Sequence, residues 1–324
     1  MKITTLIPRR VRCGFAATLI GCVCCCVTAT TALTSCGDDD LDATSVIKDS
    51  TQPKTDFDRW LDKNFRQNYN IELKYRLNDY ETDFTYTLVP ADVNNSIKLA
   101  HIILHTWLQA YDEVAGQNFT RQMAPKVLQF VGSVAWQTDN TAIMGQAEDG
   151  MKVTLFGVNQ LALTKAFLND NYFQSMHHEF THILAQSKDY DTNFQKISEG
   201  YYQPANWRNS PYNTETYALK HGFLSNYAES EYNEDFAETL AFYLIYTPAE
   251  WAAKLVAADK RDAGDAGTEL DNIKSSETIE KKLAMVRSYM QSAWDIDIDE
   301  LRTVVQRRMD EVVTGKVNLD DLSI

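Results

Sequence analysis

Residues 171–185 read NYFQSMHHEFTHILA and contain an H-E-x-x-H pattern at His178, Glu179 and His182. In an α-helix, residues four apart lie one turn above each other, so the two imidazoles can share one metal ion. Glu179 then lies beside that metal, where its carboxylate can take a proton from water. The opposite side of this helix carries an apolar stripe, formed by Phe173, Met176, Phe180, Ile183 and Leu184. The segment therefore predicts a helix with a buried face and a zinc-binding face.

A third metal ligand must come from another segment, because catalytic zinc sites use three protein ligands and one open position. Residues 231–246 read EYNEDFAETLAFYLIY and predict a helix whose second half is apolar all round. Glu234 and Glu238 lie one turn apart on it, and buried carboxylates without partners are costly. A metal ion and its histidine ligand would supply those partners. The metzincin pattern does not fit, because it would need a glycine at Ala185 and a histidine at Lys188.

The first 36 residues differ in composition from the rest of the chain. They hold four basic residues, no acidic residue and all six cysteines. Because the whole chain has a formal net charge of −14, the residues after this segment carry −18. This net negative charge on the residues after position 36 disfavours binding to nucleic acid, whose phosphates are also negative. Because residues 37–324 contain no cysteine, this part of the chain has neither disulfides nor cysteine-ligated metal.

The N-terminal segment has the layout of a secretory signal. A basic start precedes an apolar stretch at about 14–33, which predicts a signal peptide over residues 1–35. A retained membrane anchor is the alternative, since the stretch approaches spanning length. Residues 33–36, LTSC, resemble the lipobox of bacterial lipoproteins, which implies acylation of Cys36. The acidic run at 38–40 resembles the surface-export signal of Bacteroidetes-type lipoproteins and implies an outer-membrane, lipid-anchored protein that faces the cell exterior.

The rest of the chain divides into a tether and a mixed domain. Residues 36–54 are rich in Asp, Ser and Thr and predict a flexible tether. Residues 55–324 form the predicted catalytic domain, with lobes of about 55–187 and 188–324 and a cleft between them. Its pattern predicts helices over 56–67 and 96–115, strands over 71–77, 84–88, 127–136 and 151–158, and nearly continuous helix after residue 161. This order indicates an α+β fold. The strand at 151–158 is the expected edge strand above the cleft.

Residues 233–238, NEDFAE, resemble the N-E-x-x-[SA]-[DE] helix of the gluzincin zinc peptidases. In that family the first acid binds zinc and the second orients a ligand histidine. The resemblance implies Glu234 as the third ligand and Glu238 as the orienting residue. The surrounding segment is similar to anthrax lethal factor, including Tyr227 seven residues before the ligand. We expect Tyr227 to donate a hydrogen bond to the oxyanion of the transition state, with His221 and Tyr232 as alternative donors.

The chain as a whole resembles the substrate import-associated zinc metallohydrolase lipoproteins. The lipobox, the strand at 151–159, both metal helices and the helical tail carry this resemblance. It implies a zincin-like fold, with a mixed N-terminal lobe that holds a small sheet and the active-site helix, and an all-helical C-terminal lobe. It also implies one Zn²⁺ per chain, peptide-bond hydrolysis with Glu179 as general base, and a role in nutrient import. The implied partners are a peptide or glycopeptide substrate and a TonB-dependent outer-membrane importer with its surface lipoprotein.

Two other functions fit the same residues. The first is a non-catalytic, zinc-containing binding lipoprotein of an import system. Glu179 argues against it, because a structural zinc site needs no general base. The second is an amidase or glycopeptidase that acts on glycoproteins or cell-wall peptides, and the sequence does not separate it from a peptidase. Three further histidines, His101, His105 and His177, are expected to be structural.

Overall fold

The computed structural model describes residues 53–78, 85–136, 142–143, 145–148, 151–260 and 274–324. The predicted signal peptide, Cys36 and all of the predicted tether except Pro53 and Lys54 lie outside these ranges. Pro53–Ile324 forms one compact unit. Among the described residues, no helix has both the length and the apolar character needed to span a membrane.

The first helices confirm the periodicity of the sequence. Helix α1 (Asp56–Leu61) begins with a capping box between Thr55 and Asp58 and continues as a π-helical turn, Asp62–Gln67. Helix α2 (Val93–Ile103) continues through a second π-helical turn, Leu104–Leu108, into α3 (Gln109–Ala115). A short helix α4 (Gln117–Met123) follows. Helices were thus correctly predicted over 56–67 and 96–115.

The strands are shorter than predicted, and one of them does not have its expected position in the sheet. Four strands pair in the order β1 (Glu72–Lys74), β2 (Val127–Phe130), β6 (Lys152–Leu155) and β5 (Gly145–Glu148). The first three are parallel, and β5 runs antiparallel to β6. A separate antiparallel pair consists of β3 (Ala135–Trp136) and β4 (Ala142–Ile143). The strand predicted at 151–158 forms over 152–155, but its expected position at the edge was wrong, because β6 is flanked on both sides and β5 occupies that edge.

The predicted strand at 84–88 is also wrong for the described residues 85–88, which form a turn and irregular chain. Residue 84 lies outside the described ranges. The longer runs at 71–77 and 127–136 form strands over only part of their length. An apolar run of this length does not distinguish a strand from buried irregular chain. The sequence therefore predicted more strand residues than the structure contains.

The second half is helical, as predicted. Two short 3₁₀ turns occur at Val158–Gln160 and Tyr227–Glu229, and a π-helical turn at Asn169–Phe173 leads directly into the metal helix α6. The helices are α5 (Lys165–Leu168), α6 (Gln174–Ser187), α7 (Asn193–Ile197), α8 (Glu215–Lys220), α9 (Tyr232–Ile245), α10 (Pro248–Asp259), α11 (Ser275–Trp294) and α12 (Ile298–Val313).

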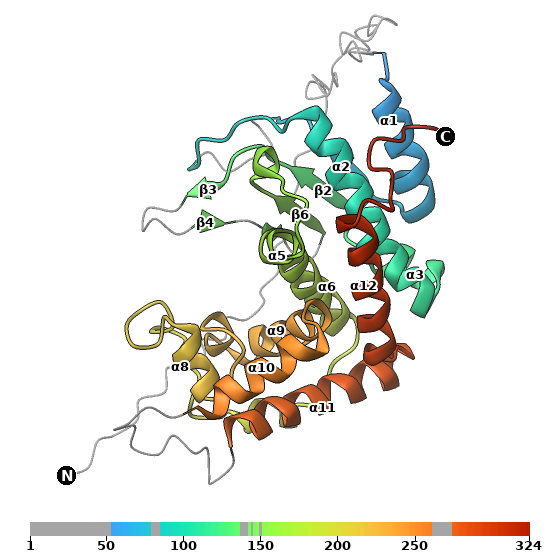
Figure 1. The fold of residues 1–324 in the computed structure, drawn as a ribbon. Helices are drawn as coiled ribbons and strands as arrows, with labels where there is room; N and C mark the ends of the chain where they lie inside the picture. Colours follow the sequence, from blue (N-terminus) through green and yellow to red (C-terminus); the bar gives the residue numbers. More distant parts are fainter. Residues whose placement is uncertain (1–52, 79–84, 137–141, 144, 149–150, 261–273) are drawn as a thin grey trace, which may run out of the picture. The chain divides into compact units, whose positions relative to one another are not determined.

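Helix α6 lies between the sheet and the C-terminal helices (Figure 1), where it contacts β5 and α9. Its predicted apolar stripe is in the core: Phe173, Met176, Phe180 and Leu184 are at most 2% exposed. Phe180 packs edge-on against the rings of Trp107 and Tyr111. The other face of α6 is therefore directed toward α9.

One hydrophobic cluster runs through the described chain from Phe57 to Leu319. The last helix returns to the first part of the chain, since α12 packs on α3 and on the π-helical turn Leu104–Leu108. Glu113 forms ion pairs with Arg307 and Arg308 at this contact. The proposed division into two lobes stays a prediction.

Candidate metal centre

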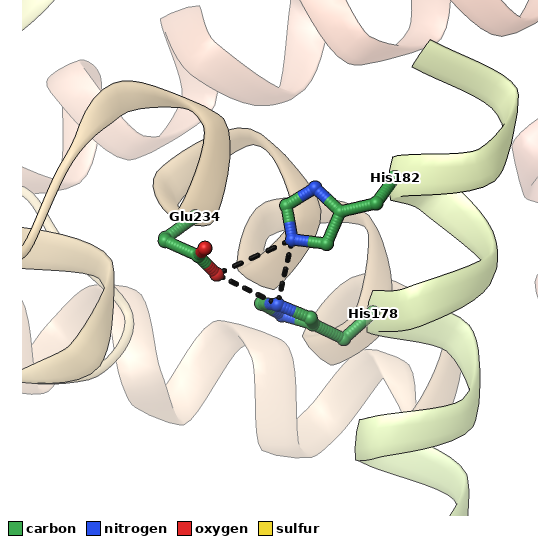
Figure 2. Close-up of side chains that lie close together, drawn as sticks. All are labelled: His178, His182 and Glu234. Atoms are coloured by element: carbon green, nitrogen blue, oxygen red, sulfur yellow. Dashed lines mark hydrogen bonds and ion pairs between the residues drawn. The ribbon is translucent and has the colours of Figure 1, made fainter. Parts of the chain in front are cut away.

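Helices α6 and α9 bring three potential metal ligands together. Figure 2 shows the rings of His178 and His182 on α6 pointing toward the carboxylate of Glu234 in the first turn of α9. The Nε2 atom of His178 lies 2.8 Å from Glu234 Oε2 and 3.0 Å from His182 Nε2. His182 Nε2 lies 3.3 Å from the same carboxylate oxygen. These three residues form a group whose ligand atoms all lie within 4.8 Å of one another.

The chemistry of this group fits a cation. His178 Nδ1 lies 2.7 Å from Glu238 Oε1, so Nδ1 carries the proton and Nε2 keeps a lone pair. That lone pair faces a carboxylate oxygen and a second imidazole nitrogen, which is repulsive unless a proton or a metal ion lies among them. Burial opposes protonation, but Glu234 and Glu238 raise the pKa of His178 to about 10, so Nε2 is protonated at neutral pH until a metal ion replaces that proton. Two imidazoles and one carboxylate are a donor set that zinc uses in catalytic sites.

Glu238 supports His178 from behind. Its carboxylate is 2% exposed and accepts hydrogen bonds from His178 Nδ1, from Ser225 Oγ at 2.6 Å and from the side-chain amide of Gln174. Sequence reasoning missed Gln174 and Ser225. Gln174 lies four residues before His178, so helical spacing could have identified it. Nothing in the sequence marks Ser225, which approaches from the chain that leads to α9.

Glu179 lies beside the ligands in an open cleft. The cleft has a volume of about 660 Å³ and is lined by Glu179, His182, Tyr232 and Glu234, among others. The Glu179 carboxylate makes no hydrogen bond or ion pair with any described residue, and burial raises its pKa. A carboxylate of this kind can accept a proton from a molecule in the cleft.

Tyr227 is the one of the three candidate donors whose ring contacts a ligand. Its ring centroid lies 5.8 Å from that of His178, and it packs edge-on against Trp207. Burial and the Glu234 carboxylate raise the pKa of Tyr227 well above its usual range, so the hydroxyl keeps its proton. Tyr232 lines the cleft, whereas His221 stacks on Tyr217 at 4.0 Å. The role of Tyr227 stays a prediction.

The other histidines have structural environments, as expected. His177 is fully buried with its Nδ1 3.1 Å from the Tyr111 hydroxyl, and burial lowers its pKa to about 3. His101 packs on the ring of Trp60 at 4.1 Å. His105 Nε2 lies 2.8 Å from Glu311 at the contact between α12 and the first part of the chain.

A second group of charges is buried between α9 and α11. Lys282 forms an ion pair of 2.7 Å with Asp235 and donates to the carbonyl of Gly222 at 2.8 Å. Tyr202 also donates to Asp235. Glu229 is 0% exposed, and neither of its carboxylate oxygens has a hydrogen-bond partner among the described residues. This group fixes the chain that carries Ser225 and Tyr227 against the helix that carries Glu234.

Comparison with known proteins agrees with this geometry. No curated protein matches the chain. A solved structure does: a crystal structure at 2.10 Å resolution from Bacteroides caccae, which is 39% identical, covers 85% of this chain and 99% of its own, and superposes with a TM-score of 0.70. It is described as a "putative zinc-binding metallo-peptidase". The model of a protein family with the same description matches residues 50–299. The chain therefore belongs to this family of zinc-binding metallo-peptidases.

Proposed function

We propose that the protein is a zinc-dependent metallohydrolase that cleaves peptide bonds, with zinc held by His178, His182 and Glu234. The observation that carries this proposal is the position of Glu179. Its carboxylate adjoins the ligand group, faces an open cleft and has no partner among the described residues. A zinc site that served only to stabilise the fold would need neither a cleft nor an adjacent unpaired carboxylate.

The residues around the ligands supply the remaining chemistry. Zinc, when bound, supplies a Lewis acid that polarises the scissile carbonyl and makes water more acidic. Glu179 accepts a proton from the attacking water and passes it to the leaving amine nitrogen. Tyr227 donates a hydrogen bond to the former carbonyl oxygen as negative charge develops there. Glu238 keeps the proton of His178 on Nδ1, which directs the Nε2 lone pair toward the metal.

We also propose a zincin-like placement of the substrate. Strand β5 is at one end of the sheet and contacts α6. An extended peptide can add to such an edge by main-chain hydrogen bonds. The peptide would then run past the helix that carries Glu179. The cleft would lie between the sheet side and the helical side of the chain, as the two-lobe prediction requires.

The cellular setting is proposed from the sequence alone. The basic start, the apolar stretch and Cys36 support a lipoprotein anchored in the outer membrane, and the acidic run at 38–40 supports exposure on the cell surface. An enzyme at that place can trim peptides or glycopeptides for uptake. Its partners would be a TonB-dependent importer and the surface lipoprotein of that importer.

The direct test is cleavage of a mixed library of peptides and glycopeptides, analysed by mass spectrometry. We expect new peptide termini with the metal-loaded protein, none after chelation, and recovery when zinc is returned. The matched control is Glu179→Gln, which should keep zinc and lose cleavage. Cleavage confined to the glycopeptides would indicate the amidase or glycopeptidase alternative. Zinc binding without any cleavage would favour the non-catalytic alternative and refute the proposal.

A further inference from the structure

The cleft at the metal centre is acidic beyond what hydrolysis requires. Four carboxylates line it, from Glu179, Asp189, Glu231 and Glu234, and none of its described lining residues is Lys or Arg. Glu179 and Glu234 have roles in the proposed reaction. Asp189 and Glu231 have none, so they are free to select the charge of a substrate.

A smaller cavity adjoins this cleft and shares Asp189 and Tyr190 with it. Its volume is about 170 Å³, which is enough for one side chain but not for a peptide. The aromatic residues Tyr190, Phe236 and Tyr289 line it, together with Asp189, Asp191 and Ser292. We call it the side pocket. It combines aromatic rings and carboxylates, whereas the core consists mainly of apolar side chains.

Tyr190 connects the side pocket to α9, the helix that carries the ligand Glu234. Its ring stacks on Phe236 at 4.0 Å with an interplanar angle of 12°, and its hydroxyl donates to Asn233 Oδ1 at 2.7 Å. Asn233 immediately precedes the ligand Glu234. The side pocket is therefore held in a fixed position relative to the metal centre. A substrate side chain that entered it would align the main chain with the ligands.

The lining of the side pocket suits a long cationic side chain. Aromatic faces attract guanidinium and ammonium groups and also contact their aliphatic stems. Asp189 makes no hydrogen bond or ion pair with a described residue, and Asp191 uses one carboxylate oxygen to accept from the backbone of Asn193. The neighbouring cation, Lys188, is already engaged by the Trp294 ring at 4.1 Å and by the carbonyl of Ala293.

We propose that the side pocket binds an arginine or lysine side chain of the substrate and thereby selects peptides with a basic residue at one fixed position from the cleaved bond. This inference rests on the proposed peptidase function. Asp189 and Asp191 are the selecting residues, and the partly exposed ring of Tyr190 contacts the stem. An acidic residue at that position is excluded by the same carboxylates.

Cleavage of three peptide libraries by the full-length, zinc-loaded protein tests this selection. The libraries are degenerate except for a central residue, which is arginine, its neutral isostere citrulline, or glutamate. An exposed ion pair and a cation–π contact together favour arginine over citrulline by roughly tenfold. We expect that preference, with cleavage at one spacing from the arginine and almost none in the glutamate library. Equal cleavage of the arginine and citrulline libraries would overturn the side pocket and leave the peptidase function intact.

Two variants locate the effect. Asp189→Asn and Asp191→Asn should each reduce the preference for arginine by several-fold, with cleavage of the citrulline library unchanged. The matched control is Glu277→Gln, which removes the same charge from an exposed site on α11 outside both cavities. A preference that falls equally in Glu277→Gln would reflect the overall charge of the protein and refute the assignment.

A binding measurement separates this inference from the proposed function. The zinc-loaded Glu179→Gln protein should bind the arginine library about tenfold more tightly than the citrulline library in calorimetric titrations. If that preference is present but the unmodified protein cleaves nothing, the peptidase function falls and the side pocket stands. If Glu179→Gln binds both libraries equally, the side pocket is refuted whatever the enzyme cleaves.

Discussion

Each of the three ligand side chains should be necessary for tight metal binding. Replacing His178, His182 or Glu234 with Ala removes one of three donors, and we expect loss of tight zinc binding in each case. Glu238→Ala leaves the donors in place but frees His178 Nδ1, so zinc affinity should fall by about 10–100-fold. Titration against a zinc-competing dye, with total zinc from atomic absorption, measures both effects.

The control for metal binding is His221→Ala, because His221 stacks on Tyr217 and belongs to no described ligand group. It should keep the full zinc content. If Glu238→Ala removes the metal and Glu234→Ala does not, the roles of the two acids are reversed. Full zinc retention after His182→Ala would contradict the entire assignment.

Removal of one oxygen atom tests the assignment of Tyr227. Tyr227→Phe keeps the ring that contacts His178 and Trp207, so folding and zinc content should not change. Loss of a single donor to the developing oxyanion should lower kcat by roughly 100-fold or more, with little change in KM. Steady-state kinetics on a cleaved library peptide measure this. If more than about half of the turnover survives, the hydroxyl is not the donor and Tyr232 becomes the next candidate.

At the scale of the element, the two metal helices and three of the four strands of the main sheet could be predicted, whereas strand β5 and the position of β6 inside the sheet could not. H-E-x-x-H on the side of the helix opposite an apolar stripe identified α6, and two acids in an otherwise apolar segment identified α9. Both signals are local, because helical neighbours lie three or four residues apart in sequence. The position of β6 inside the sheet depends on β5, a strand of four residues with little apolar pattern of its own.

The hydrogen bond from Ser225 to Glu238 could not be predicted from the sequence either, because it too depends on contacts between separate segments. The two residues are thirteen apart and belong to different elements, and their 2.6 Å contact depends on how the chain before α9 folds back. The side pocket has the same origin. Its walls come from the segment after α6, from α9 and from α11, and no periodicity links these three.

The elements that meet behind α9 give a prediction about pH. Burial raises the pKa of Glu229 to about 8, and Lys282, which is paired with Asp235, offsets only part of that rise. In the unfolded chain Glu229 has its usual pKa of 4.5. Between pH 4.5 and pH 8, Glu229 is therefore protonated in the folded protein and ionised in the unfolded chain. Stability therefore falls as pH rises through this window. Glu229→Gln should remove that loss and stabilise the protein at pH 8 by on the order of 1–3 kcal/mol.

Thermal unfolding of the zinc-loaded variant and parent at pH 5 and pH 8 measures this effect. We expect nearly equal melting temperatures at pH 5, where Glu229 is protonated in the folded protein, and a higher one for Glu229→Gln at pH 8. Glu277→Gln, on the exposed side of α11, serves as the control and should show no such difference. A Glu229→Gln variant that is less stable than the parent at pH 8 would show that the carboxylate is ionised and paired.

At the scale of the whole molecule, the anchor is the feature to test. Cys36→Ser should prevent acylation and release the protein from the membrane fraction, because multiple acyl chains hold a lipoprotein firmly and a chain without them has no such anchor. Replacing Asp38, Asp39 and Asp40 together should leave the protein lipidated but less accessible to protease added to intact cells. Fractionation and protease shaving measure these outcomes. Unchanged protease accessibility would discard surface export while leaving the lipid anchor in place.

The return of α12 to α3 has a consequence for how the chain acquires its structure. The N-terminal helices cannot complete their burial until the last ordered helix has been synthesised, because α12 covers α3 and the turn at Leu104–Leu108. Contacts between such distant segments slow folding. A nascent chain that stops before Ile298 should therefore stay open to proteases, and the complete chain should become resistant in a single step. Folding of the described domain would then be completed only after α12 has left the ribosome.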